Sequence, residues 1–285
     1  MKNINNRRKP EWLKIKLPND EEYSRMNKII KKYNLHTICT SGKCPNAGEC
    51  WGLGTATFMI LGDICTRSCK FCAVKTGKPL PVDKDEPMHI AESVKLLSLK
   101  HCVITSVDRD DLSDYGSDIW VETIKAVKKV NPKTTMEVLI PDFMGDYESL
   151  KKVIDAKPEV ISHNMETVRR LTPKVRSKAQ YDRSLEVVKR ISEAGIISKS
   201  GIMVGIGEKE DEIYQTMEDL LNVGCKVFTI GQYLQPTKHN MPVTEYVTPE
   251  TFKKYEEIGL EKGFKFVESS PLVRSSYHAA KHVNC

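Results

Sequence analysis

The placement of cysteine is the most informative feature of this sequence. Six of the nine cysteines fall between Cys39 and Cys72, while Cys102, Cys225 and Cys285 are isolated. An odd number of cysteines argues against a framework of disulfide bonds. Thiolates are strong ligands for iron and zinc, so this clustering indicates metal binding.

The segment from Cys65 to Cys72 has the spacing C-x3-C-x2-C, with Cys69 between them, and follows directly after a predicted strand. Three thiolates on one loop can hold three irons of a four-iron cluster, and no fourth cysteine lies near enough in sequence to complete the set. The remaining iron would be open to a small molecule, as one position is at a catalytic metal. A zinc ribbon is the alternative, but it needs a second C-x2-C pair, which the sequence lacks.

A second set, Cys39, Cys44 and Cys50, has the spacing C-x4-C-x5-C. Gly42 and Gly48 within it allow the chain to fold back around a ligand. Three thiolates again favour a cluster over a single metal ion, and the fourth ligand must come from another part of the chain.

The rest of the sequence alternates short apolar runs with amphipathic patterns. The predicted strands are 56–61, 102–107, 135–140, 160–163, 197–204, 226–230 and a short one at 264–268. The predicted helices are 21–32, 89–99, 119–130, 147–155, 181–194, 210–222 and 249–262. Apolar strands that alternate with helices indicate an α/β fold with a parallel sheet covered by helices. Six such units favour a partial (β/α)6 TIM-like barrel over a full eight-stranded one.

We expect one barrel with an extension at each end. Residues 1–54 form the N-terminal extension with the second cysteine set, and their segment 37–54, rich in Gly, Cys, Asn and Pro, predicts a loop. Residues 55–270 form the barrel, and residues 271–285 form a C-terminal tail.

Composition narrows the class of protein. Hydrophobic residues make up 40% and charged residues 29% of the chain, which is typical of a soluble globular protein. No apolar run approaches the roughly 20 residues that span a bilayer, so no membrane association is expected. The net charge of +6 is modest and dispersed, so nucleic-acid binding is not expected either. The basic N-terminus has no apolar stretch behind it, which predicts a cytoplasmic protein without a secretory signal.

The first motif, with Phe71 before its last cysteine, resembles that of the radical S-adenosylmethionine superfamily. In that superfamily S-adenosylmethionine chelates the open iron of a [4Fe-4S] cluster, and an electron from the cluster cleaves it to a 5′-deoxyadenosyl radical. The resemblance implies that Cys65, Cys69 and Cys72 hold such a cluster and that Phe71 lies beside the S-adenosylmethionine.

Further superfamily segments lie at the ends of later predicted strands. The stretch Gly201–Glu208 resembles a G-x-I-x-G-x-x-E motif that contacts adenine, with Met203 at the Ile position. Glycines such as Gly205 let a backbone approach a flat base closely. Thr105 and Ser106 occupy the place where relatives bind the methionine amino group.

Asn164 and Glu166 follow the fourth predicted strand. The resemblance implies that they bind the ribose or methionine part of S-adenosylmethionine, but Asn and Glu after a strand can equally cap the next helix. Arg109 is expected to pair with neighbouring aspartates. Cys102 and Cys225 lie in apolar runs and are expected to be small buried hydrophobes.

The order of the two cysteine sets resembles the lipoyl synthase family in particular. That family's C-terminal R-S-S-Y appears as Arg274–Tyr277, and its N-terminal K-P-x-W-L-K appears as Lys9–Lys14. By its matching position, Ser276 would be the fourth ligand of an auxiliary [4Fe-4S] cluster on the second cysteine set, through its hydroxyl oxygen.

The resemblance implies a sulfurtransferase that inserts sulfur at the sixth and eighth carbons of a protein-bound octanoyl-lysine to form the lipoyl cofactor. The first cluster would start the radical chemistry, and the auxiliary cluster would donate the sulfur and be consumed. The alternatives are another sulfur-inserting radical enzyme and, in a different class, an iron–sulfur electron-transfer protein or a zinc-dependent binding module.

The same resemblance implies three kinds of partner. The substrates would be octanoylated lipoyl carrier domains, namely subunits of 2-oxoacid dehydrogenases and the glycine cleavage H protein. An electron donor such as ferredoxin or flavodoxin would reduce the first cluster, and an iron–sulfur carrier would rebuild the second. The positive charge of the chain would suit an acidic carrier domain.

Overall fold

The structure is a computed structural model that describes residues 9–14, 24, 28, 36–41, 44, 46–52 and 55–284. The helix predicted at 21–32 falls almost wholly outside these residues, and so does Cys285. Within the described part of the chain, no helix is long and apolar enough to cross a membrane.

The centre of the molecule is an eight-stranded sheet in the order β1-β2-β5-β6-β7-β8-β9-β10. Its parallel strands are β2 (Thr55–Ile60), β5 (His101–Ser106), β6 (Thr135–Leu139), β7 (Val160–Ser162), β8 (Ile197–Val204), β9 (Val227–Gln232) and β10 (Phe266–Ser270). At one edge the short β1 (His36–Thr37) pairs antiparallel with β2. Neighbours in the sheet follow chain order, as successive strand–helix units of one hand produce.

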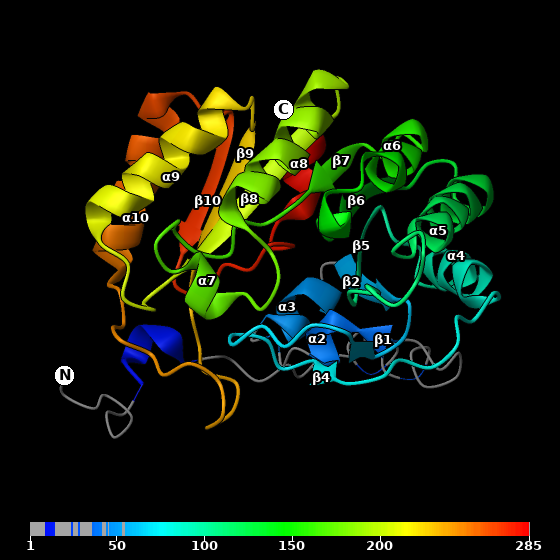
Figure 1. The fold of residues 1–285 in the computed structure, drawn as a ribbon, viewed down its shortest axis with the longest axis horizontal. Coiled ribbons are helices and arrows are strands. Elements are labelled where there is room, and N and C mark those ends of the chain that lie inside the picture. The colour runs from blue at the N-terminus through cyan, green and yellow to red at the C-terminus, as the bar shows by residue number, and fades with distance from the viewer. Residues whose placement is uncertain are drawn as a thin grey trace.

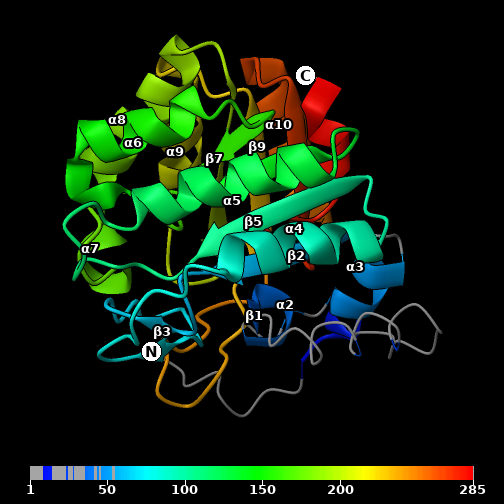
Figure 2. The same ribbon diagram turned by 90° about the vertical axis from the view of Figure 1, so that its right-hand side faces the viewer.

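Helices cover the outer face of this sheet (Figures 1 and 2). They are α4 (Glu86–Leu96), α5 (Ser117–Val130), α6 (Tyr147–Asp155), α8 (Tyr181–Glu193), α9 (Glu210–Asn222) and α10 (Pro249–Lys262), with the short α7 (Thr172–Val175) before α8. In α5 the buried residues Trp120, Ile124 and Val127 recur at helical spacing and face the sheet. The predicted α/β class and partial barrel are confirmed.

The prediction of a loop at 37–54 was wrong. The chain there forms α2 (Ile38–Ser41) and α3 (Ala47–Gly52), which pack against β2. Trp51 is 2% exposed and belongs to the hydrophobic core. Burial of this ring and of the neighbouring Cys39 stabilises helical turns that the Gly- and Pro-rich composition disfavours.

The sequence also gave no sign of a small second sheet beside the barrel. There β3 (Ile64–Cys65) pairs with β4 (Lys75–Thr76), so that the first cysteine motif is the loop between two paired strands. Cys102 and Cys225 are buried, at 0% and 3% exposure, as predicted.

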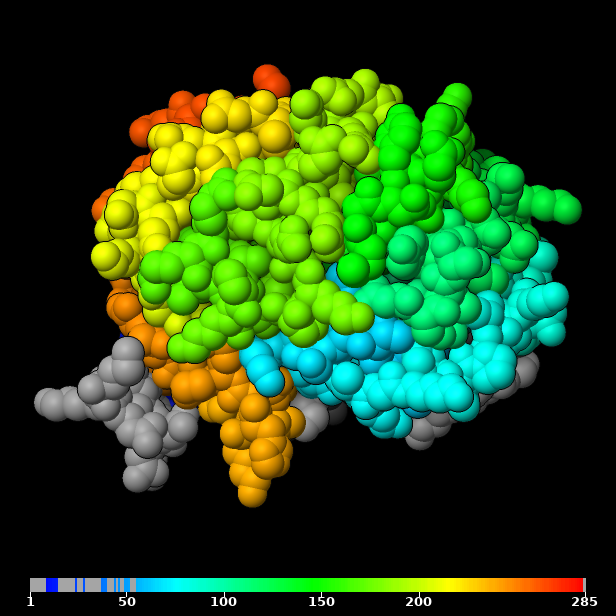
Figure 3. All heavy atoms as spheres, in the orientation of Figure 1, coloured from blue at the N-terminus to red at the C-terminus, as the bar shows by residue number. Residues whose placement is uncertain are grey.

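The C-terminal tail folds back across the sheet. A Cβ on Gly231 of β9 would lie 2.1 Å from the backbone oxygen of Val273, so the tail passes directly against this strand. The tail ends in η4 (Ala279–Asn284), which contacts β5 and β6 and is visible in red behind α8 in Figure 1. On the face drawn in Figure 3 the helices cover the sheet, and the β9–α10 loop projects from the edge.

Candidate active site

A cavity of about 280 Å³ lies at the carboxyl ends of the parallel strands. Parallel barrels place their active sites at this end. The cavity is lined by nine of the residues selected from the sequence, namely Cys65, Cys69, Phe71, Cys72, Thr105, Ser106, Asn164, Glu166 and Met203. Their positions in the sequence are far apart, and the common direction of the strands brings them together.

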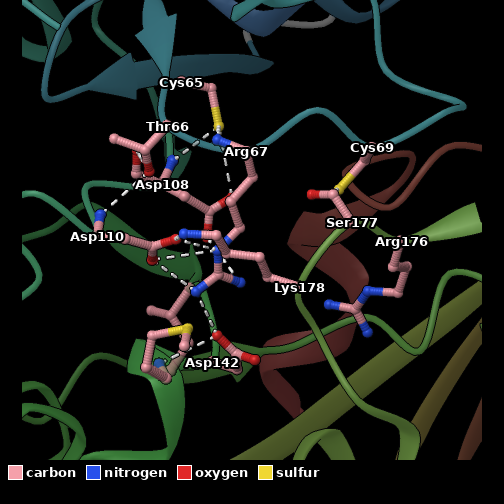
Figure 4. A network of polar contacts seen from close by, with 12 residues as sticks. Cys65, Thr66, Arg67, Cys69, Asp108, Asp110, Asp142, Arg176, Ser177 and Lys178 are labelled. Atoms are coloured by element: carbon pink, nitrogen blue, oxygen red, sulfur yellow. Dashed lines mark hydrogen bonds and ion pairs between the residues drawn. The ribbon is translucent and has the colours of Figure 1, made fainter. Parts of the chain in front are cut away.

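The first cysteine loop is fixed to the strand ends by a buried guanidinium (Figure 4). Arg67 is 5% exposed and holds both oxygens of Asp110, with Nε donating to Oδ2 at 2.9 Å and Nη2 donating to Oδ1 at 2.7 Å. The same group contacts Asp108 at 3.2 Å and Asp142 at 2.8 Å. These aspartates follow β5 and β6, so Arg67 ties the cysteine loop to two strands at once.

Three carboxylates share this one guanidinium, and their acidities differ. Burial raises the pKa of Asp108; the positive charge of Arg67 opposes this rise, and the negative charges of Asp142 and Asp110 add to it. Burial also disfavours the charged form of Asp142, but there the positive charge of Arg67 prevails and the pKa is lowered. Asp108 is therefore the carboxyl most easily protonated, and its Oδ2 lies 3.6 Å from the Sγ atom of Cys65.

Two further loops hold the cysteine motif from the other side. The amide of Ser68 donates to Ser177 Oγ at 3.1 Å, and the amide of Lys70 donates to the oxygen of Val175 at 2.8 Å. From the β9–α10 loop, Asn240 donates its side-chain amide to the oxygen of Lys70 at 3.2 Å. The motif is thus positioned by loops that follow four different strands.

The three thiols of this motif fit an iron–sulfur cluster. All of them face the same cavity, and none is joined in a disulfide. Burial raises the pKa of Cys65 to about 12, with the nearby Asp108 adding to it, and burial raises the pKa of Cys72 to about 11. Thiols in this environment keep their protons until a metal ion displaces them.

The wall opposite the cysteines offers unpaired polar atoms. Among the described residues, Ser106 Oγ and Asn164 Oδ1 are buried without a hydrogen-bond partner. Asn164 Nδ2 donates to Glu166 Oε1 at 3.1 Å, and Glu166 adopts a positive φ of 65°. A buried polar atom without a partner is costly, so these atoms are suited to a polar ligand in the cavity. Thr105 is different, because its hydroxyl donates to the oxygen of Leu139 at 3.1 Å.

Two glycines, Gly201 within β8 and Gly205 directly after it, are required for different structural reasons. Gly201 lines the cavity, and a Cβ there would meet Thr229 Oγ1 at 2.2 Å. Gly205 does not line the cavity. Its φ is +94°, and a Cβ would lie 2.2 Å from Gln232 Nε2 and 2.4 Å from the oxygen of Glu245. Packing against its own protein thus accounts for this glycine without a bound base.

Arg67, Arg176 and Arg274 line the cavity, and of these the sequence motifs pointed only to Arg274, in the R-S-S-Y segment. Arg176 Nη1 donates to the oxygen of Asn164 at 3.1 Å and to Ser184 Oγ at 2.9 Å, and Arg274 lies across the cavity near the second cysteine set. No motif singled out Arg176. Arg109, which was considered, pairs with Asp111 as predicted and does not line the cavity.

The second cysteine set lies beside the C-terminal tail. Burial raises the pKa of Cys39 to about 11 and that of Cys50 to about 12, and in both cases the thiolate of Cys44 adds to the effect. The three sulfurs are therefore close enough to repel one another when ionised, which fits a shared cluster. Burial also raises the pKa of Cys44, and there the positive charge of Arg274 opposes the rise.

Two contacts connect this set to the tail. Asn46 Nδ2 donates to the oxygen of Leu272 at 2.6 Å, and the hydroxyl of Tyr277 donates to Glu49 Oε1 at 2.9 Å. Ser276 precedes Tyr277 and is half-buried. The structure thus brings the R-S-S-Y segment and the second cysteine set together, although more than two hundred residues separate Glu49 from Tyr277.

Two family models match parts of the chain, and curated relatives match nearly all of it. The model of the radical SAM superfamily matches residues 59–220, and that of the N-terminal domain of lipoyl synthase matches residues 1–44. The lipoyl synthase of Parabacteroides distasonis is 62% identical over 276 residues, which cover 97% of this chain and 98% of that protein. The chain belongs to the lipoyl synthase family. The lipoyl synthase of Treponema denticola is likewise 63% identical over 278 residues, which cover 98% of this chain and 96% of that protein.

Solved structures share the fold at low identity. Streptococcus suis SuiB bound to the precursor peptide SuiA has a TM-score of 0.61 at 11% identity, over 86% of this chain and 52% of that chain. HydG, a maturase of the [FeFe]-hydrogenase, has a TM-score of 0.57 at 14% identity, over 93% of this chain and 78% of that chain. These likenesses support the partial barrel alone. Lipoyl synthases use S-adenosylmethionine and two [4Fe-4S] clusters, and these are the cofactors of this member of the family.

Proposed function

We propose that this lipoyl synthase builds the lipoyl group inside the cavity at the strand ends, with its two cysteine sets on opposite sides of the substrate. The reaction is sulfur insertion at the sixth and eighth carbons of a protein-bound octanoyl-lysine. Cys65, Cys69 and Cys72 hold the first cluster, and the second cysteine set with Ser276 holds the auxiliary cluster.

One observation carries this arrangement. The cavity that contains the first three thiols is also lined by Ile38, which precedes Cys39, and by Ser275, which precedes Ser276. The first ligand set thus lines this space, and the second lies directly behind its wall, since Cys39 and Ser276 follow lining residues but do not line the cavity themselves. A substrate carbon in this space can be reached from either side without leaving the protein.

When bound, the first cluster and S-adenosylmethionine supply a radical that abstracts hydrogen from an unactivated C–H bond, and the auxiliary cluster supplies sulfur. The chain's own residues provide the setting. Arg176 donates to the backbone oxygen of Asn164, whose side-chain Oδ1 is unpaired, and the two residues line the part of the cavity where the polar parts of S-adenosylmethionine can bind. Phe71, Met203 and Ile140 give the cavity an apolar surface that suits adenine and an alkyl chain.

A direct assay tests the proposal. Reconstituted protein is incubated without oxygen with S-adenosylmethionine, a strong reductant and an octanoyl-lysine peptide, which is then weighed by mass spectrometry. Gain of two sulfurs and loss of two hydrogens, together with 5′-deoxyadenosine, is the expected result. Formation of 5′-deoxyadenosine with an unchanged peptide would overturn the substrate, and absence of both from protein with about eight irons would overturn the radical chemistry.

The substrates are lipoyl carrier proteins in general. We infer that they include subunits of 2-oxoacid dehydrogenases and the glycine cleavage H protein, and that ferredoxin or flavodoxin reduces the first cluster while an iron–sulfur carrier rebuilds the second. The net charge of +6 supports acidic partners. The cytoplasmic location and the division at residues 54 and 270 stay predictions.

A further inference from the structure

A fully buried group of charged and polar side chains lies inside the barrel, away from the cavity. Lys199 of β8 and Glu137 of β6 are both 0% exposed, and Lys199 Nζ lies 2.9 and 2.8 Å from the two carboxylate oxygens of Glu137. Lys199 is the third residue of its strand, so the pair lies toward the end opposite the cysteines. Nothing in the proposed chemistry uses these residues.

The C-terminal tail supplies the remaining partner of this lysine. His282 in η4 is 0% exposed, and its Nδ1 lies 3.2 Å from Lys199 Nζ. An ammonium group has three hydrogens to donate, and Glu137 occupies two of these directions. Among the described residues, His282 is the acceptor of the third. Burial lowers the pKa of His282, which favours the neutral ring whose Nδ1 can accept this hydrogen bond.

The tail is held at this point by packing as well. The ring of Phe266 meets that of His282 edge to face, with centroids 4.7 Å apart. Ala279 is also 0% exposed, and η4 contacts β5 and β6. The segment η4 is thus packed against the interior of the barrel.

Six residues before His282 stands Ser276, and between them the chain makes a sharp turn. His278 adopts a positive φ of 52°, and the amide of Lys281 donates to its oxygen at 2.9 Å. Before this turn, the hydroxyl of Tyr277 donates to Glu49, the residue that precedes Cys50 of the second cysteine set. The tail is therefore held at two places. One is at the second cysteine set, close to Ser276, and the other is inside the barrel, at His282.

We propose that His282 acts as a latch, which by bonding to the Lys199–Glu137 pair tethers the C-terminal tail and thereby positions Arg274 and Ser276 at the second cysteine set. This inference rests on the proposed role of Ser276. The latch is a positioning device, since His282 does not line the cavity and is not among the proposed ligands. With His282 in place, the hydrogen bonds between the tail and the second cysteine set can break and form again while the tail remains attached to the barrel.

Hydrogen exchange of the cluster-loaded protein tests the latch directly. His282→Leu keeps the volume of the ring but removes the acceptor, and we expect amides of residues 273–281 to exchange at least about tenfold faster. His282→Gln retains an acceptor and should restore exchange to within about threefold of the unmodified protein. His89→Ala, on α4 far from the tail, is the matched control and should change nothing. Unchanged exchange in His282→Leu would overturn the latch.

The second readout separates positioning from general stability. In His282→Leu, iron analysis and Mössbauer spectroscopy should show loss of the auxiliary cluster, while 5′-deoxyadenosine formation at the first cluster stays within about twofold. Equal loss of both clusters would overturn the positioning role.

A further variant covers the case in which His282→Leu does not fold. Glu137→Met with Lys199→Met removes both buried charges together, which proteins tolerate better than removal of one. The same loosening of residues 273–281 is expected there, and its absence would count against the latch. Because exchange is measured without turnover, a loosened tail in a protein that inserts no sulfur would leave the latch standing and overturn the proposed function.

Discussion

The two cysteine regions are held in different ways. The first loop is clamped by a buried guanidinium that contacts three aspartates, and by hydrogen bonds between its backbone and side chains of two further loops. The second region is connected to the tail by two hydrogen bonds, Asn46 to Leu272 and Tyr277 to Glu49. Among the described residues, the first region is thus tied to the strand ends by buried ionic contacts, whereas the second packs on β2 through α2 and α3 and is linked to a segment from the other end of the chain.

This difference matches the two tasks proposed for the clusters. A cluster that starts every radical must stay in one place through many turnovers, and ionic contacts buried in the barrel provide that. A cluster that gives up its sulfur must be dismantled and rebuilt. A site closed by a tail that can be moved, with a hydroxyl rather than a thiolate as its fourth ligand, suits that task.

The largest effect is expected at the first loop. Cys69→Ala removes one of three thiolates and should lower 5′-deoxyadenosine formation at least ~1,000-fold, because the open iron is lost with the cluster. Chromatography of the quenched reaction measures this product. Near-normal formation of 5′-deoxyadenosine would break the assignment of the first cluster.

Arg67→Met tests whether the clamp stabilises the first loop. Loss of the guanidinium leaves Asp108, Asp110 and Asp142 without their shared partner, and removal of one side of a buried ion pair typically costs about 3–5 kcal/mol. Urea unfolding measures the change in the free energy of unfolding.

Arg170→Met is the control, because Arg170 pairs with Glu212 at the surface, where such pairs are worth about 0–1 kcal/mol. If the two variants lost the same free energy of unfolding, the contacts of Arg67 would stabilise the protein no more than a surface ion pair does, which would contradict the proposed role of Arg67.

Substitution of Ser276 should impair sulfur insertion and leave radical formation at the first cluster nearly unchanged. We expect Ser276→Ala to lower sulfur insertion about tenfold or more, while cleavage of S-adenosylmethionine stays within about twofold, since the first loop is untouched. Ser276→Cys should keep a cluster but release its sulfur slowly, because thiolate holds iron more firmly than an alkoxide. Wild-type sulfur insertion in both variants would remove Ser276 from the ligand set.

The smallest effect concerns the contact between tail and cysteine region. Tyr277→Phe removes one hydrogen bond to Glu49, worth about 0.5–1.5 kcal/mol, and should speed loss of the auxiliary cluster in the presence of a chelator about two- to tenfold. Tyr214→Phe breaks a similar phenol–carboxylate contact with Glu210 on α9 and should leave cluster loss unchanged. The same rate in both variants would show that Tyr277 does not secure the second site.

The sequence was sufficient for the barrel and for the first cysteine loop, because both are encoded locally. Strands such as Thr55–Ile60 are largely apolar runs of the right length, and Cys65, Cys69 and Cys72 are near one another in the chain. At Ala47–Gly52, by contrast, the local composition predicted a loop, but burial of Trp51 stabilises a helix.

Contacts between distant segments could not be predicted from the sequence. Nothing near Arg176 marks it as part of the cavity, and its position follows only from the loop that packs on the cysteine motif. The same holds for His282, whose partner Lys199 lies in β8 and reads in sequence as an ordinary lysine. Such contacts arise from the closure of the barrel and from the return of the tail, which local patterns do not encode.

The division of labour between the two cysteine regions is tested most directly by Cys39→Ala. In one anaerobic reaction with the octanoyl-lysine peptide, 5′-deoxyadenosine is quantified and the peptide is weighed. We expect 5′-deoxyadenosine at a reduced but readily measured level, within about tenfold of the unmodified protein, and no sulfur in the peptide. A peptide that still gains two sulfurs would contradict the assignment of the second region as the sulfur donor.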